Sequence, residues 1–165
     1  MTPRLTTARL VLRGLEARDA PAIQEGLSDW EVARWLSAPP WPYGREDADW
    51  FIHEAEGQHY AIDAGEGLIG VISVKPDLGY WLRRDHHGRG LMSEAAEAAV
   101  QAYFETTQEP LVSGHFEGNA ASRRVLTKLG FRDTAPEVTF ARPLGQDVTV
   151  QRMRLTADDW RASRA

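Results

Sequence analysis

Short runs in which apolar and polar residues alternate are spread along most of the chain, and turn-forming residues separate them. Such runs are typical of β-strands with one buried face. We expect strands at residues 9–15, 60–63, 68–74, 77–82, 111–116, 131–134, 138–141 and 148–155. Between the second and third of these runs, the segment Ala64-Gly65-Glu66-Gly67 predicts the turn of a β-hairpin.

Other apolar residues recur at helical spacing, and residues that cap helices precede several of these stretches. Asp19 and Asp29 are expected to cap two helices, and Asn119 to cap a third that ends at Gly130. The repeats predict helices at residues 20–27, 30–36, 46–56, 93–104 and 120–129.

Tryptophans fall within these helical patterns. Trp30, Trp35 and Trp50 recur with other apolar residues, so we expect them in the core, with Trp50 and Phe51 pointing inward. Between the second and third helices, residues 38–44 include three prolines, which remove backbone donors and restrict their neighbours. This segment is therefore predicted to be a loop.

The predicted elements follow one another in the order βααα-βββα-βα-ββ. Hairpins come first and strand–helix–strand crossovers later, which fits a mixed sheet in a layered α/β domain. A chain of 165 residues is long enough to bury a substantial core. Because no repeat, low-complexity tract or linker interrupts it, we expect a single domain over residues 1–165.

Composition narrows the functional classes. The net charge of −5 argues against bulk binding of nucleic acid, which requires neutralisation of phosphates. The chain has no cysteine, so disulfides, thiolate metal sites and cysteine nucleophiles are excluded. The first residues lack an apolar core of signal-peptide length, and no run of about 18 apolar residues occurs. We therefore expect a cytoplasmic protein that does not act on membranes.

Residues 79–94 combine a short apolar strand, a glycine-containing loop and the first turn of an alanine-rich helix. This order places free backbone N–H groups at the positive end of a helix dipole, where an anion can bind. Gly88 and Gly90 lack Cβ, so the chain can turn tightly and a phosphate can approach the main chain. We hypothesise a cofactor with a pyrophosphate group. The alternative is that both glycines serve only as turn residues.

Two other phosphate-binding signatures fit this loop poorly. Ser93 replaces the third glycine of a dinucleotide-binding fingerprint, and no acidic residue follows at the expected distance after a second parallel strand. A Walker loop requires Gly-Lys followed by Ser or Thr, which this chain lacks. A Rossmann-type oxidoreductase is therefore the least favoured interpretation of this loop. The adjacent His86 and His87 do not predict a metal site, because neighbouring loop side chains rarely converge on one ion.

A second motif, Asn119-Ala120-Ala121-Ser122-Arg123-Arg124, is followed by Lys128-Leu129-Gly130-Phe131. With earlier segments in matching order, it resembles the GNAT superfamily of N-acetyltransferases, and within it the ribosomal-protein N-terminal acetyltransferases. The earlier segments are residues 7–13, 42–43, 68–70, 79–82, 88–91 and 93–95. Each segment is weak alone, but the ordered set spans nearly the whole chain.

The resemblance implies a mixed, mostly antiparallel, splayed sheet flanked by helices, and acetyl-CoA as the cofactor. Main-chain groups of the strand at 80–82 would pair with pantetheine amides, and N–H groups of the loop would hold the pyrophosphate. Where the family usually has Gln or Arg, this chain has Asp85, so Arg89, Arg83 or Arg84 would compensate. The implied cofactor-binding residues are Tyr80, Trp81, Leu82, His86, His87, Gly88, Arg89, Gly90, Leu91, Met92, Ser93, Asn119, Arg123 and Lys128.

The resemblance also suggests catalytic residues. Many relatives carry a tyrosine seven residues after the asparagine as the general acid, but Leu126 stands there in this chain. Ser122 follows Asn119 by three residues, so its hydroxyl could protonate the departing thiolate, or it could be a surface serine of the first helical turn. The proton of the substrate ammonium would pass to Asp77, Glu117 or His115. Trp41 and Tyr43 would line the acceptor pocket, or would be core or dimer contacts.

We therefore interpret the sequence as an acetyl-CoA-dependent N-acetyltransferase that acts on a primary amine, either a protein N-terminus or a small molecule. Relatives are commonly homodimers. The alternative is a non-catalytic acyl-CoA-binding or regulatory module, which the missing tyrosine and Asp85 keep open. The acceptor and the acyl-chain length do not follow from the sequence.

Overall fold

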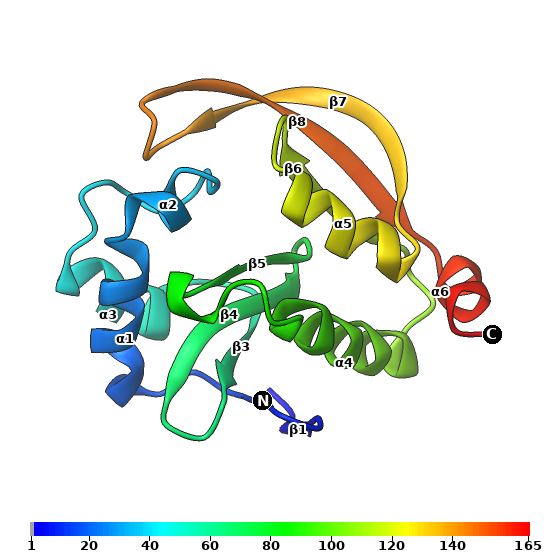
Figure 1. The fold of residues 1–165 in the computed structure, drawn as a ribbon, viewed down its shortest axis with the longest axis horizontal. Coiled ribbons are helices and arrows are strands. Elements are labelled where there is room, and N and C mark those ends of the chain that lie inside the picture. Colours follow the sequence, from blue (N-terminus) through cyan, green and yellow to red (C-terminus); the bar gives the residue numbers. More distant parts are fainter. Residues whose placement is uncertain (1) are drawn as a thin grey trace.

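The computed structural model describes residues 2–165 and consists of two antiparallel sheets flanked by helices (Figure 1); Met1 lies outside the described residues. One sheet has five strands in the order β1-β2-β3-β4-β5, and the other has three in the order β6-β8-β7. The strands are β1 (Leu5–Thr6), β2 (Val11–Arg13), β3 (Gln58–Asp63), β4 (Leu68–Lys75), β5 (Gly79–Leu82), β6 (Leu111–Phe116), β7 (Arg132–Ala141) and β8 (Gln146–Leu155).

Helices α1 (Ala20–Leu27) and α3 (Arg45–Glu54) cover one face of the five-stranded sheet, and α4 (Leu91–Thr106) covers the other (Figure 1). The other helices are α2 (Trp30–Ala33), α5 (Ala120–Leu129) and α6 (Ala157–Arg164), with short 3₁₀ turns η1 (Ala17–Asp19) and η2 (Arg84–His86). Within residues 2–165, no helix combines the length and the apolar character needed to cross a membrane.

The period of two along the central strands divides the core into two layers. Tyr60 and Ile62 of β3 pack in the cluster that includes the buried alanines of α4. Ala61, which lies between them, belongs instead to the cluster that includes α1 and the buried residue of α3. Because successive strand side chains point to opposite faces, the same strand stabilises both layers.

The predicted GNAT-like α/β fold with antiparallel strands flanked by helices is confirmed. The strand at 111–116 and the helix at 120–129 have the bounds that the sequence predicts. The two runs predicted at 131–134 and 138–141 form the single strand β7, whose register shifts between Asp133 and Pro136. Proline is tolerated there because β7 is an edge strand, where a missing N–H removes no inner ladder bond. Strand β1 and helix α6 are not predicted by the sequence pattern.

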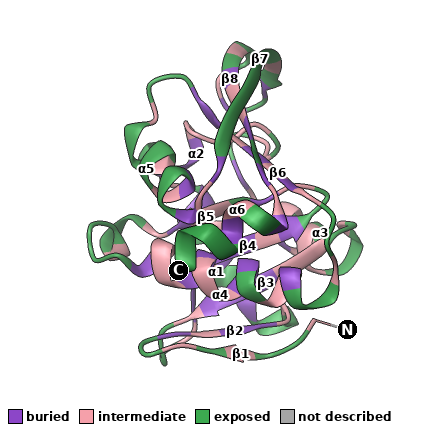
Figure 2. Ribbon diagram, turned by 90° about the vertical axis from the view of Figure 1, so that its right-hand side faces the viewer, coloured by how far each residue is buried: buried purple, intermediate pink, exposed green. Residues whose placement is uncertain are grey.

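Two of the three tryptophans expected in the core are wrongly predicted. Trp50 is 60% exposed and Trp30 is 37% exposed, although both lie on helices as expected. The ring of Trp30 lies edge-on to that of Trp41, with centroids 5.0 Å apart, so it finds an aromatic neighbour at the surface. Figure 2 shows that β7 is exposed along most of its length, in contrast to the buried central strands.

Hydrogen bonds join the two sheets where β5 and β6 begin. The N–H of Leu78 donates to the carbonyl of Val112 over 2.8 Å, and the hydroxyl of Ser113 donates to the carbonyl of Leu78 over 2.7 Å. Beyond this point no ladder joins β5 to β6 in the described part of the chain. The strands therefore diverge, and the helices that follow them, α4 and α5, begin beside the gap between them.

Candidate active site

A cleft of about 1060 Å³ opens where β5 and β6 separate. One wall consists of β5 and the loop that leads into α4, and the other consists of the end of β6 and one face of α5. Residues of α2, β7 and β8 line the part of the cleft farther along. The cleft therefore draws on segments from almost the whole length of the chain.

The start of α4 faces this cleft with its backbone donors free. Gly88 and Gly90 have φ angles of +76° and +73°, and both line the cleft. Gly90 is the N-cap residue of α4, and no side chain caps the helix there. Within residues 2–165, no protein acceptor takes a hydrogen bond from the N–H groups of residues 88–93. A Cβ added at Gly88 would meet no atom within 4 Å, so the space in front of this backbone is open.

This loop is held in place from the N-terminal end of the chain. Glu94 of α4 accepts hydrogen bonds from the hydroxyl of Thr7, from the N–H of Arg9 at 2.9 Å and from Nε of Arg9 at 2.8 Å. The guanidinium of Arg9 also donates to the carbonyl of Arg89 over 3.0 Å. These bonds lower the pKa of Glu94 although burial of the carboxylate opposes them. The first residues and the glycine loop thus form one hydrogen-bonded unit.

Cationic side chains approach the same region from two directions. Arg84 lines the cleft from η2, and Arg124 and Lys128 line it from α5. Free N–H groups at a helix start and nearby cations are the features that bind phosphate groups. The residues present therefore fit a diphosphate-bearing ligand such as CoA.

Asp85, which stands where the family usually has Gln or Arg, does not line the cleft. Its carboxylate accepts a hydrogen bond from Nδ1 of His86 at 3.1 Å and lies 3.9 Å from Nε of Arg83. His87, the next residue but one, donates from Nε2 to the carbonyl of Leu82 over 2.7 Å. Asp85 is thus neutralised at the surface, away from the bare N–H groups.

The start of α5 is built in a different way. Asn119 is its N-cap residue, and the Oδ1 atom of Asn119 accepts the N–H of Ser122 at 3.2 Å. The Oγ atom of Ser122 lies 2.8 Å from the hydroxyl of Tyr80 on β5, so this contact spans the cleft. Burial raises the pKa of Tyr80 to about 12, although the hydrogen bond with Ser122 offsets part of the rise. The phenol is therefore protonated at neutral pH.

The proposed bases lie in different surroundings. Asp77 lines the cleft, but its carboxylate pairs with the guanidinium of Arg152 at 2.8 Å. His115 is buried, and both ring nitrogens are occupied, Nδ1 by the carbonyl of Phe116 at 3.0 Å and Nε2 by Arg123 at 3.3 Å. Both ring nitrogens of His115 are therefore already hydrogen-bonded within the protein.

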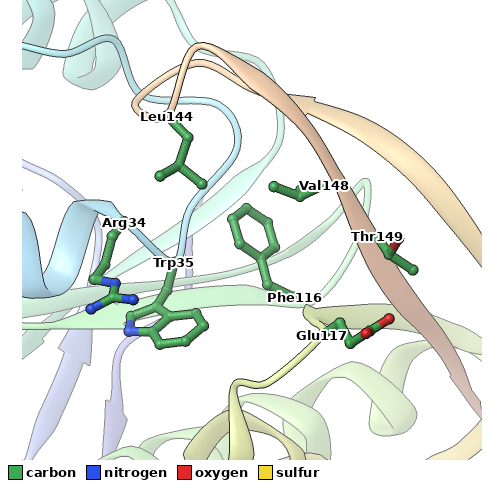
Figure 3. Close-up of a pocket in the computed structure, with 7 residues that line it drawn as sticks. All are labelled: Arg34, Trp35, Phe116, Glu117, Leu144, Val148 and Thr149. Atoms are coloured by element: carbon green, nitrogen blue, oxygen red, sulfur yellow. The ribbon is translucent and has the colours of Figure 1, made fainter.

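Glu117 lies outside the main cleft, in a smaller pocket of about 260 Å³ next to it. Figure 3 shows the ring of Phe116 at its centre, with Arg34 and Glu117 on opposite sides. Trp35 and Phe116 line both cavities, so the pocket adjoins the cleft.

Several predicted site residues do not line the cleft. Arg123 pairs with both carboxylate oxygens of Asp133, at 2.9 and 3.0 Å, and faces away from it. Arg89 also lies outside the lining, and its guanidinium donates to the carbonyl of Asp85. Trp41 and Tyr43 line neither cavity, and Tyr43 is only 7% exposed in the core layer beneath α1. The position of Tyr43 therefore favours the interpretation that it is a core residue over the interpretation that it lines the acceptor pocket.

Several residues that line the cleft are not among the site residues predicted from the sequence. Arg124 is one, and the helical period provided a signal, because residues 121, 124, 125 and 128 form one stripe of α5 and Arg123 is off it. Glu31, Val32 and Arg152 also line the cleft, but they come from distant elements, and no local pattern marks them. Among residues 2–165, no group of three or more His, Asp or Glu side chains is placed to hold a metal ion.

Comparison with known proteins agrees with this geometry. Residues 9–132 match the family model described as "Acetyltransferase (GNAT) domain". The chain is 27% identical over 141 residues to the uncharacterized N-acetyltransferase YnaD of Bacillus subtilis (strain 168), which covers 78% of this chain and 82% of the relative.

Solved structures share the fold. A GNAT-family acetyltransferase from Bacillus anthracis superposes with a TM-score of 0.82 at 21% identity, over 94% of this chain and 99% of the other. RimL, a ribosomal L7/L12 α-N-protein acetyltransferase in complex with CoA, superposes with a TM-score of 0.79 at 19% identity, over 95% and 99%. Since the family model spans most of the sequence, the chain belongs to the GNAT acetyltransferase family.

Proposed function

We propose that this protein transfers an acetyl group from acetyl-CoA to a primary amine. The observation that carries the proposal is the row of N–H groups at residues 88–93, which lack a protein acceptor in the described chain and face a cleft between diverging strands. The cofactor supplies an activated acetyl thioester: the amine nitrogen takes the acetyl carbon, the carbon–sulfur bond breaks, and the sulfur gains a proton.

The chain's own groups divide the binding work. The N–H groups of residues 88–93 would hold the diphosphate, and Lys128, Arg124 and Arg84 would add positive charge around it. β5 is the edge strand of its sheet, so its backbone between Tyr80 and Leu82 can pair with the amides of the pantetheine arm. His86, His87 and Asn119 line the same channel.

Ser122 is the proposed acid, because it lines the cleft and its hydroxyl lies beside β5, whose backbone would hold the pantetheine arm. Asp77 and Glu117 are the proposed acceptors of the proton that the substrate ammonium loses. Asp77 lines the cleft but is engaged with Arg152, whereas Glu117 has no ion-pair partner within residues 2–165. The pH dependence of kcat/KM for Asp77→Asn and Glu117→Gln separates the two, because loss of the true base removes the acidic limb of the profile.

The acceptor is a primary amine of a small molecule or of a protein N-terminus. Three carboxylates line the cleft, and each is paired with an arginine: Glu31 with Arg34 at 3.7 Å, and Asp77 and Glu137 with Arg152 at 2.8 and 3.7 Å. Their charges are therefore largely compensated, and they do not by themselves select an ammonium group. Two structural relatives carry names that point to different classes, ribosomal protein L7/L12 for RimL and microcin C7 immunity for MccE. The homodimer and the cytoplasmic location stay predictions.

Release of CoA thiol from acetyl-CoA over a panel of amines and short peptides tests this proposal. We expect turnover with at least one amine that depends on both substrates. The competing function is an acyl-CoA-binding module without catalysis. One observation favours it: Leu126, at the position of the usual tyrosine, is fully buried in the core and cannot serve the cleft. Tight CoA binding without turnover for any amine would establish the module instead.

A further inference from the structure

The contact between Tyr80 and Ser122 joins the two walls of the cleft. Tyr80 belongs to β5 and Ser122 to α5, and 42 residues separate them in the sequence. The phenol oxygen lies 2.8 Å from Oγ of Ser122 and 3.3 Å from the carbonyl oxygen of Ser122. Both residues line the cleft, so the pair faces the space where the cofactor is proposed to bind.

We propose that Tyr80 is a positioning residue for Ser122, which it holds so that the serine proton points into the cleft toward the thioester sulfur. The inference rests on the proposed function, since it assigns a role within that reaction. Leu126, at the position where many relatives have a tyrosine acid, cannot donate a proton. The hydroxyl pair of Tyr80 and Ser122 would take over that role.

The phenol of Tyr80 has a single donor, and two acceptors of Ser122 lie within reach, Oγ at 2.8 Å and the carbonyl oxygen at 3.3 Å. Either hydroxyl can be the donor in the shorter contact, and in the proposed arrangement the phenol is that donor. When the phenol donates to Oγ, the proton of Ser122 must point elsewhere. Within residues 2–165, the hydroxyl of Ser122 has no hydrogen-bond partner other than Tyr80. The open direction is the cleft.

The hydrogen bond between Tyr80 and Ser122 also stabilises the charge that forms during acetyl transfer. As the carbon–sulfur bond breaks, the sulfur takes the bonding electron pair and accepts the proton of Ser122. The phenol then stabilises the negative charge that develops on Oγ, because a hydrogen bond to an ionised acceptor is stronger than one to a neutral acceptor. Water returns a proton to Oγ, and the amine nitrogen releases one proton to the base or to water. One proton thus moves overall from nitrogen to sulfur, and Tyr80 keeps its own.

Two measurements on four variants test the inference. The variants are Tyr80→Phe, Ser122→Ala, the double variant, and Tyr103→Phe as a matched control, because Tyr103 is half-buried on α4 and its hydroxyl donates to the carbonyl of Pro110. We expect Tyr80→Phe to lower kcat about tenfold, with KM for acetyl-CoA changed less than about twofold. The double variant should be no slower than Ser122→Ala, since both residues act through one proton. Tyr103→Phe should behave as the wild type.

The second measurement does not need turnover. Titration of bound CoA, followed by the ultraviolet absorbance of its thiolate, reports hydrogen-bond donation to the sulfur. We expect the pKa of the bound thiol to be lower in the wild type than in Tyr80→Phe or Ser122→Ala, by a similar amount in each. Equal thiol pKa values in all variants, or losses of kcat that multiply in the double variant, would overturn the inference. If no amine is acetylated, the proposed function fails, and the thiol titration alone still decides whether Tyr80 and Ser122 act on the sulfur.

Discussion

The two helices that border the cleft begin in opposite ways. α4 follows Gly90, which has no side chain to accept from the first turn, and the N–H groups of residues 88–93 have no acceptor within the described chain. α5 follows Asn119, whose Oδ1 atom takes the N–H of Ser122. The first helix therefore offers its backbone to a ligand, and the second satisfies its backbone internally and offers a side chain.

This difference shows how a single cap residue assigns a helix start to binding or to chemistry. An Asn cap stabilises a helix by about 1 kcal/mol relative to Ala but by only a few tenths relative to Gly, so the glycine cap of α4 costs little stability. The positive end of the α4 dipole then remains available for an anion. At α5, the cap fixes the first turn, so the hydroxyl of Ser122 is held against Tyr80.

The largest effect is expected when the bare start of α4 is blocked. Gly88→Val should raise KM for acetyl-CoA at least about tenfold, because hydrogen bonds to a charged group are each worth about 1.5–3 kcal/mol. Gly65→Val is the matched control: Gly65 also has positive φ, +111°, and open space, but it lies in the β3–β4 turn. Both variants place valine at a positive φ, so both carry backbone strain. Equal KM values for the two variants would mean that the diphosphate does not bind at the N–H groups of residues 88–93.

Ser93→Asp should move stability and binding in opposite directions. A carboxylate in the first turn of α4 stabilises the helix by about 0.3–1 kcal/mol, which raises Tm by roughly 1–3 °C. The same charge repels the diphosphate, so KM for acetyl-CoA should rise about tenfold, and less at high salt. Ser93→Asn, the uncharged control, should leave KM near the wild-type value. A tighter-binding Asp variant would contradict an anion at this helix start.

A smaller effect is expected at Glu94, which holds the glycine loop to Thr7 and Arg9. Glu94→Gln should raise KM for acetyl-CoA about threefold, since one charge-assisted contact weakens. Because the folded pKa of Glu94 is depressed, its stabilisation is present above the ordinary carboxyl pKa of about 4.3 and is lost as pH falls through the folded value. The Tm difference between the two proteins should therefore shrink in acid. A gap that widens below about pH 4 would refute this assignment.

The capped helix should show the smallest effect on cofactor binding. Asn119→Ala should lower stability by about 1 kcal/mol, a fall in Tm of roughly 2–4 °C. Its effect on KM for acetyl-CoA should stay below about threefold, because the Oδ1 atom of Asn119 is already engaged by the N–H of Ser122. Asn119→Asp keeps an acceptor and should restore the Tm. A loss of affinity as large as that of Gly88→Val would remove the distinction between the two helix starts.

The sequence predicts these two helix starts well because their signals are local. Asn119 and Gly130 mark both ends of α5, and Gly88 and Gly90 mark the loop before α4. Edge strands and surface helices are predicted less well. Trp50 follows a helical repeat, yet its helix has little buried surface, so the repeat alone does not decide which face is inside.

Contacts between distant segments explain most of the rest. The pairing of Tyr80 with Ser122 depends on how far β5 and β6 diverge, and no local pattern encodes that. Residues of α2 and β8 also reach the cleft only through contacts between distant segments, so no local pattern marks them. The prediction of Arg123 in place of Arg124 as a cleft residue is a different case. The helical period of α5 alone is enough to show that Arg124, and not Arg123, lies on the face toward the cleft.

Titration of the ¹⁵N-labelled protein with CoA and with pantetheine, followed by backbone amide resonances, tests the central claim most directly. Pantetheine lacks the diphosphate. We predict that CoA shifts the amides of residues 88–93 strongly and that pantetheine leaves them nearly unchanged, while both ligands perturb the residues of β5. If the amide resonances of residues 88–93 stay unshifted when the protein is saturated with CoA, the account is contradicted.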